Sequence, residues 1–304
     1  MTKIVVTQPL DLSKEQKTKL NSLGTVTFYD DIAVTPEEWL RRCAGFDVVC
    51  SGITGLRESY SGLSDVLVTV PFVGVSSFAD SEILASRKIT LCNSPGSNRH
   101  AVSEWIIFMV LETTRKFMHY INTTEEPTTP TPVRSPGLAD KNITILGCGN
   151  IGKRVGSVCK ALDMDVQYFK RGDTLVEKVK DADIVVDTLS ANPTTKGLLD
   201  QRFFQSLKTG AAFISVTVDA TVDFDAMLDA LDSNRLAVVA FDVMNAKPGD
   251  ITNPLYLKLQ THPKVLATPC IASYSTTTSR IGNDMMIANI EAWLANGPIH
   301  VFEG

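Results

Sequence analysis

Six residues near the middle of the chain have the types and spacing of a phosphate-binding turn. Residues 147–152 are Gly-Cys-Gly-Asn-Ile-Gly, so glycines stand at the first, third and sixth positions. The first glycine permits a tight turn, the second lets a pyrophosphate approach the backbone, and the third lets a helix pack closely on a strand. An apolar run over 143–146 precedes the motif and a helical pattern over 151–162 follows it, which is the context that the motif requires. The motif predicts a dinucleotide-binding loop formed by Gly147, Gly149, Asn150, Ile151 and Gly152.

The residues after the next strand determine which dinucleotide such a loop would take. An acidic residue there binds the ribose 2′-hydroxyl of NAD, whereas a cation accommodates the 2′-phosphate of NADP. This chain has Lys170 and Arg171 after the expected strand 166–169, and no carboxylate before Asp173. We therefore expect NADP as the cofactor, with NAD disfavoured. The simpler alternatives are a solvated loop at these two cations and a glycine-rich turn that binds nothing.

Two series of alternating strands and helices surround these residues. The expected strands are 3–7, 25–29, 47–50, 66–70 and 89–92 in the first series, and 143–146, 166–169, 184–186, 212–216 and 238–241 in the second. Long helices are expected over 97–117 and 276–296, and the Thr- and Pro-rich segment 123–137 is expected to be an exposed connection. This pattern predicts an α/β protein with two doubly wound parallel-sheet domains, the second a Rossmann dinucleotide-binding domain.

Composition narrows the class of protein further. The 304 residues are 44% hydrophobic and 21% charged, which are globular proportions. A net charge of −5 has the wrong sign for binding nucleic acid or an anionic membrane, so neither partner is expected. No apolar run approaches the ~20 residues of a membrane span, and the first residues lack a signal-peptide pattern. The six cysteines form no CxxC pair, which predicts free thiols, no metal site and a cytoplasmic location.

Several segments resemble, in order, the D-2-hydroxyacid dehydrogenase family, which includes phosphoglycerate, glycerate, hydroxypyruvate and formate dehydrogenases. The resembling segments are 70–75, 93–98, 101–104, 147–152, 207–214, 241–243 and 268–269. The resemblance implies a dinucleotide-binding domain over 96–275 and a discontinuous substrate or lid domain made of 1–95 plus 276–304. It also implies a small-molecule substrate and a homodimer.

The residues that carry out catalysis in this family are missing from the matching positions. Family members reduce 2-oxo acids with an Arg that holds the carbonyl and carboxylate, a His that donates a proton, and a Glu that holds the His. Alignment on the flanking residues places Val218 at the Arg position, Lys247 at the Glu position and Cys270 at the His position. The family mechanism is therefore not expected here, although Thr217 and Asp242 are still expected beside the cofactor.

Other side chains could take over the proton transfer. The candidates are Lys247, Cys270, Tyr274 and His100, for which the simpler roles are a solvated loop lysine, a buried thiol, a surface phenol and a helix cap. The loop formed by Ser51, Gly52 and Ile53 follows a strand of the first series. By resemblance, its backbone N–H groups would hold the carboxylate of the substrate.

Three functions are compatible with these residues. The first is an NADPH-dependent oxidoreductase that reduces a small carbonyl or imine by altered chemistry. The second is a catalytically silent NADP-binding sensor or scaffold, and the third is a conventional 2-hydroxyacid dehydrogenase whose catalytic residues lie elsewhere. The intact glycine loop favours hydride chemistry or sensing over a pure scaffold, and the intact Asp242, which by resemblance lies beside the nicotinamide, favours an enzyme.

Overall fold

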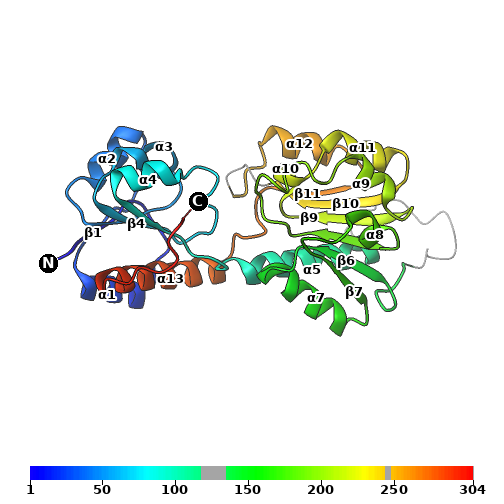
Figure 1. Ribbon diagram of the computed structural model, residues 1–304, viewed down its shortest axis with the longest axis horizontal. Coiled ribbons are helices and arrows are strands. Elements are labelled where there is room, and N and C mark those ends of the chain that lie inside the picture. The colour runs from blue at the N-terminus through cyan, green and yellow to red at the C-terminus, as the bar shows by residue number, and fades with distance from the viewer. Residues whose placement is uncertain (118–134, 244–247, 304) are drawn as a thin grey trace. The chain divides into compact units, whose positions relative to one another are not determined.

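The computed structural model describes residues 1–117, 135–243 and 248–303, with the backbone alone at 218 and 219, and it divides into two compact units (Figure 1). Unit 1 consists of Met1–Asn98 and Ser275–Gly304, and unit 2 is Arg99–Tyr274. We predicted lid and cofactor roles for 1–95 plus 276–304 and for 96–275, and these roles stay a prediction. Lys247 and most of the expected connection 123–137 lie outside the described residues.

Unit 1 is a five-stranded parallel sheet with the strand order β2-β1-β3-β4-β5. Its strands are β1 (Lys3–Val6), β2 (Thr25–Phe28), β3 (Val48–Cys50), β4 (Val66–Thr69) and β5 (Ile89–Cys92). Its helices are α1 (Lys14–Leu23), α2 (Pro36–Cys43), α3 (Leu56–Ser59), α4 (Ser81–Arg87) and α13 (Thr276–Leu294), with the short 3₁₀ turn η1 (Tyr60–Gly62). The strand order reverses between β1 and β3, and ligands of such sheets bind at the carboxyl ends of the strands at this point.

Alternate side chains of each strand of unit 1 feed two separate cores, as the two-residue period of a strand requires. Val5 and Val49 pack with Trp39 of α2 on one face. Ile4 and Val48 pack on the other face with α1 and with the α13 residues Met286, Ile287 and Ile290. Figure 1 shows α2, α3 and α4 on one side of this sheet and α1 and α13 on the other. The C-terminal helix is therefore part of the unit 1 core.

Unit 2 is a six-stranded parallel sheet with the order β11-β10-β9-β8-β6-β7. Its strands are β6 (Asn142–Leu146), β7 (Asp165–Phe169), β8 (Ile184–Asp187), β9 (Ala211–Ser215), β10 (Leu236–Asp242) and β11 (Val265–Thr268). Its helices are α5 (Arg99–Arg115), α7 (Asn150–Ala161), α8 (Leu175–Val179), α9 (Gln201–Ser206), α10 (Val218–Thr221), α11 (Phe224–Asp232) and α12 (Pro254–Gln260). The strand order reverses between β6 and β8, so the glycine loop begins at this switch point.

Apolar layers cover both faces of the second sheet, which is why its strands are nearly continuous hydrophobic runs. Helices α5 and α7 cover one face, where Ile106 and Val155 pack on Ile145 and Ile214. The opposite face is covered by α8, α9, α11 and α12 (Figure 1). Both faces of the unit 2 sheet are therefore filled by side chains, and the carboxyl edge of the strands is left for polar groups.

Where element ends differ from the predicted ones, they differ by one or two residues, for local reasons. The long helix expected over 97–117 runs from Arg99 to Arg115, because Lys116 has a left-handed φ of 54°. The helix expected over 276–296 ends at Leu294, and Asn296 likewise has a φ of 59°. All six cysteines lie in the described part of the chain and are free thiols. Within that part, we find no helix with both the length and the apolar character needed to cross a bilayer.

Candidate functional site

The glycine loop after β6 has a backbone that only glycine fits at two positions. Gly147 has a φ of 101°, and a Cβ there would lie 3.0 Å from the carbonyl oxygen of Thr188. A Cβ on Gly152 would lie 2.3 Å from the carbonyl oxygen of Gly147. The first and third glycines of the motif therefore allow the turn to close and α7 to approach β6.

The middle glycine is required by nothing inside the described protein. A Cβ on Gly149 would meet no described atom within 4 Å, and its φ of −79° suits any residue. Gly149 and Asn150 are exposed and Ile151 is half-buried, and no described side chain caps the start of α7. Free N–H groups at a helix start attract phosphate. The glycine loop and the start of α7 therefore fit a pyrophosphate, because Gly149 has no side chain on the side where the ligand would bind.

The turn after β7 exposes two cations and contains a carboxylate that is already hydrogen-bonded within the turn. Asp173 accepts a hydrogen bond from the backbone N–H of Lys170 at 2.9 Å and lies 3.7 Å from the ammonium of Lys178. Lys170 and Arg171 are exposed, and neither takes part in an ion pair between described residues. The loop thus has free positive charge and an engaged carboxylate, which suits a phosphate better than a hydroxyl.

A buried carboxylate that sequence reasoning missed lies at the end of β8. Asp187 is fully buried and accepts hydrogen bonds from the hydroxyls of Ser215, Thr217 and Thr221 at 3.0, 2.9 and 2.6 Å. Its other oxygen accepts the backbone N–H of Leu189 at 3.0 Å. Burial raises the pKa of Asp187, although the hydrogen bonds, led by Thr221, oppose the shift.

The Asp187 cluster fixes the segment that follows β9. Asp187 and Ser215 are register partners on neighbouring strands, so the carboxylate faces the loop at Thr217. Thr217, expected beside the cofactor, therefore has its hydroxyl committed to Asp187. The available signal was the position of Asp187 at the last residue of an apolar strand, where polar side chains gather in this fold.

Asp242 at the end of β10 organises the segment after β11. It is 3% exposed and accepts the backbone N–H groups of Ile271 and Ala272 at 2.9 and 2.8 Å, together with the hydroxyl of Thr268. Burial raises the pKa of Asp242, and hydrogen bonds led by that of Thr268 oppose the shift. The Trp105 indole donates to Thr268 at 3.1 Å and so joins α5 to this cluster. Asp242 acts as a positioning residue for the chain around residues 270–272.

The candidate proton donors are placed differently from one another. Cys270 is half-buried beside the Asp242 cluster with a left-handed φ of 57°, whereas Tyr274 is 70% exposed. His100 is on the first turn of α5, where its Nε2 accepts from Arg99 at 3.3 Å. Val218 begins α10. Of the candidates that the structure describes, Cys270 is the one that lies next to the Asp242 cluster. Among the described residues, no His, Cys, Asp and Glu cluster could hold a metal ion.

In unit 1, the loop Ser51–Gly52–Ile53 follows β3 at the switch point. Ser51 is buried, and its hydroxyl is bound by the Trp39 indole at 3.1 Å and lies 2.8 Å from the Thr7 hydroxyl. No hydrogen bond between described residues uses the backbone N–H of Gly52 or Ile53. A fixed turn with free N–H donors is a ready site for a carboxylate.

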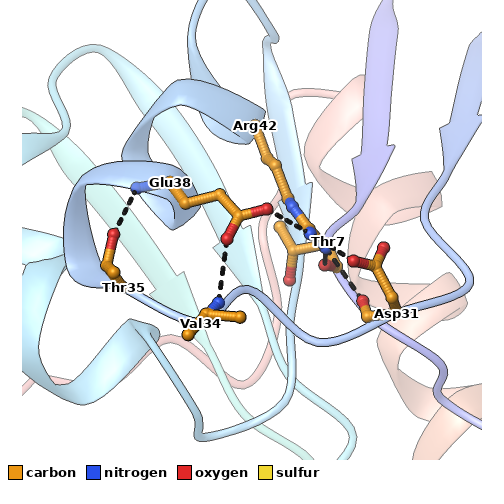
Figure 2. A network of polar contacts seen from close by, with 6 residues as sticks. All are labelled: Thr7, Asp31, Val34, Thr35, Glu38 and Arg42. Atoms are coloured by element: carbon orange, nitrogen blue, oxygen red, sulfur yellow. Dashed lines mark hydrogen bonds and ion pairs between the residues drawn. The ribbon is translucent and has the colours of Figure 1, made fainter.

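Arg42 of α2 holds the end of β1 beside this loop (Figure 2). Its guanidinium donates to the carbonyl oxygen of Thr7 at 3.0 Å and forms ion pairs with Asp31 at 2.8 Å and Glu38 at 2.6 Å. Burial lowers the pKa of Arg42, but the hydrogen bonds that it donates to the carboxylates of Glu38 and Asp31 outweigh this effect, and the net pKa is raised. Arg42 therefore stays charged and serves the scaffold rather than a ligand.

Comparison with known proteins identifies the family. Residues 107–272, more than half of the chain, match the family described as D-isomer specific 2-hydroxyacid dehydrogenase, NAD binding domain. The chain belongs to this family, and the matched residues 107–272 all lie in unit 2. Its sequence is 28% identical over 239 residues to D-3-phosphoglycerate dehydrogenase of Archaeoglobus fulgidus, covering 74% of this chain and 44% of that one. It is 26% identical over 219 residues to D-lactate dehydrogenase of Streptococcus pyogenes, covering 64% and 66%.

The chain thus spans between about two fifths and two thirds of the length of these two relatives. Among solved structures, an acyclic imino acid reductase, Bsp5, in complex with NADPH and D-Arg has the same fold, with a TM-score of 0.83 and 22% identity. That match covers 99% of this chain and 100% of the other. D-2-hydroxyisocaproate dehydrogenase matches with a TM-score of 0.77 and 19% identity over the full length of both chains. These likenesses confirm the predicted α/β fold with two parallel sheets.

Proposed function

We propose that the protein is an NADPH-dependent oxidoreductase that reduces the 2-oxo or 2-imino group of a small organic acid. The observation that best supports this function is the glycine loop at the switch point of the unit 2 sheet. Gly147 and Gly152 allow the loop to close, and Gly149 leaves room for a ligand. No described atom requires a glycine at 149, which supports a ligand as the reason for its small size.

The preference for NADPH rests on the turn after β7. Lys170 and Arg171 would hold the 2′-phosphate, because Asp173 is engaged within the turn and leaves no acceptor for a 2′-hydroxyl. The solved imino acid reductase with the same fold holds NADPH. When bound, the reduced nicotinamide supplies the hydride.

The residues of this chain would then have three tasks. The N–H groups of Gly52 and Ile53 hold the carboxylate of the acid, and Asp242 keeps the segment of Cys270 in place. A proton must reach the reduced oxygen or nitrogen from a group other than the missing histidine. Cys270, Tyr274, His100 and Lys247 are the candidates for that step.

A catalytically silent NADP-binding protein is the second candidate. It is favoured by the occurrence of Val218 and Cys270 at the positions where the family has its arginine and histidine. A valine cannot bind a carboxylate, so a silent protein would keep the cofactor loop and lose substrate turnover.

Two assays distinguish these functions. Titration of the reduced-cofactor fluorescence should give a lower Kd for NADPH than for NADH, and the reverse order would contradict the assignment of Lys170 and Arg171. Consumption of NADPH should then be followed with glyoxylate, pyruvate and hydroxypyruvate, each alone and with methylamine to form the imine. Turnover of any of them supports the reductase, and NADPH binding without turnover of the whole panel supports the silent protein.

We further propose that the protein forms a homodimer through α5 and acts in the cytoplasm. Phe108 and Leu111 are 50% and 38% exposed and stand three positions apart on one face of this helix, where neighbouring exposed apolar side chains favour association. Light scattering of the purified protein should give twice the mass of the chain. Replacement of Phe108 by Glu should give the monomer mass.

A further inference from the structure

Gln8 is a buried side chain whose amide has no partner in the described protein. It directly follows Val6 and Thr7 at the end of β1 and is only 9% exposed. Its Oε1 is shielded from solvent and accepts no hydrogen bond, and Nε2 donates none to a described residue. A buried polar group without a partner is disfavoured, so such a group calls for a ligand or another explanation.

The Gln8 amide lies against the loop that follows β3. A Cβ on Gly52 would be 2.4 Å from Nε2 and 2.8 Å from Cδ of Gln8, so the amide occupies the space that any side chain at position 52 would fill. Glycine at 52 therefore allows Gln8 to rest directly on the loop backbone. The backbone of Gly52, whose N–H is free among the described residues, and the amide of Gln8 therefore lie side by side.

Hydrogen bonds hold the residues that come directly before Gln8 and Gly52. Arg42 binds the carbonyl oxygen of Thr7, the residue before Gln8, as Figure 2 shows. The hydroxyls of Thr7 and Ser51 are in contact, and Trp39 donates to Ser51. The unpaired polar atoms are thus on a rigid scaffold at the switch point between β1 and β3, where ligands of this sheet type bind.

We propose that Gln8 binds the substrate acid directly, with one Nε2–H donating to the carboxylate and the other to the oxygen or nitrogen on the next carbon. This inference rests on the proposed function and identifies a specificity residue for it. The amide nitrogen carries two N–H donors, and both the carboxylate and a 2-oxo, 2-imino or 2-hydroxyl group can accept a hydrogen bond.

Binding of short acids to the protein with NADP⁺ tests the assignment. The probes are glycolate, which has both a carboxylate and a 2-hydroxyl, and acetate, which has the carboxylate alone. Fluorescence of Trp39, which contacts the loop through Ser51, gives the readout, with calorimetry as a second measurement. We expect wild-type protein to bind glycolate more tightly than acetate.

Variants at position 8 should separate a binding role from a packing role. Gln8→Leu should weaken glycolate binding about 10-fold to 100-fold and remove the preference over acetate, with the NADPH Kd unchanged. Gln8→Glu should weaken binding at neutral pH by charge repulsion and recover it as the new carboxyl is protonated in acid. Leu10→Ala is the matched control, because Leu10 lies in the same loop and packs on the unit 1 core. It should leave the glycolate Kd unchanged.

The outcomes keep the two proposals apart. Glycolate binding by Gln8→Leu at the wild-type Kd overturns the role of Gln8 and leaves the proposed function intact. So does a Gln8→Glu protein whose binding does not respond to pH. If wild-type protein binds NADPH but none of glycolate, D-lactate and D-glycerate, the acid substrate class of the proposed function is wrong, and the inference falls with it.

Discussion

A methyl group at Gly149 would separate ligand binding from folding. The Cβ of Gly149→Ala meets no described atom within 4 Å and the local φ is −79°, so the folded backbone accepts alanine without strain. On the ligand side, the same methyl group occupies the path by which a pyrophosphate reaches the backbone. We expect Gly149→Ala to fold normally and to bind NADPH weakly.

The expected sizes follow from the contacts. Crowding by one methyl group costs about 1–3 kcal/mol, which raises the NADPH Kd about 5-fold to 160-fold. Alanine is a poorer helix N-cap than glycine by less than about 1 kcal/mol, so Tm should fall by at most about 4 °C. Gly152→Ala differs, because its Cβ would lie 2.3 Å from a backbone oxygen. Overpacking of about 3 kcal/mol, offset by about 1 kcal/mol of helix propensity, should lower Tm by about 4–8 °C.

Fluorescence titration with NADPH and thermal melts without cofactor measure the two effects separately. Gly297→Ala is the control, since a Cβ at this position also meets no described atom within 4 Å and it lies in unit 1. It should change neither the Kd nor Tm. Wild-type NADPH affinity in Gly149→Ala would refute the argument that position 149 is kept bare for a phosphate.

Three further results are expected. Replacement of Lys170 and Arg171 by Ala should raise the NADPH Kd at least about tenfold and leave the NADH Kd unchanged, as titrations would show; equal losses would contradict the 2′-phosphate assignment. Burial raises the pKa of Asp187 above its value of about 3.9 in the unfolded chain. The stability that this group contributes is therefore complete below the pKa of the unfolded chain and is lost as the pH rises through the pKa of the folded protein. Asp187→Asn should therefore gain stability relative to wild type from about pH 4 upward in urea melts, and a constant difference across pH would argue against this. Trp39→Phe should lower the urea-derived stability by about 1–3 kcal/mol, because Ser51 loses a buried donor; an unchanged midpoint would show that this bond is dispensable.

Local patterns were enough to predict most of the fold. Strand 143–146, the glycine motif and the helix after it were expected within one residue of β6 and α7, because period, capping and glycine requirements are local. Ser13 and Thr35 cap α1 and α2 through their side chains, as the sequence around both helices indicates. Element ends shifted where a single residue, such as Lys116, adopts a left-handed conformation that no pattern announces.

The site was predicted less completely, since its contacts join distant parts of the chain. Asp187 and Ser215 meet because β8 and β9 are paired in a particular register, which neither segment specifies alone. Gln8 and Gly52 are likewise brought together by the pairing of β1 with β3. The glycine loop could be predicted from the sequence because the residues that define it are six consecutive positions.

Because α13 is part of the unit 1 core, unit 1 cannot finish folding during synthesis until this C-terminal helix has been made. Met286, Ile287 and Ile290 close the layer over Ile4 and Val48, yet nearly two hundred residues separate them from the last strand of that sheet. At ribosomal rates of 5–20 residues per second, the first sheet waits roughly 10–40 s for its last helix. Unit 2 is continuous and emerges whole before that. The nascent chain therefore has an uncovered apolar sheet face during this interval, which is a natural point of attachment for chaperones.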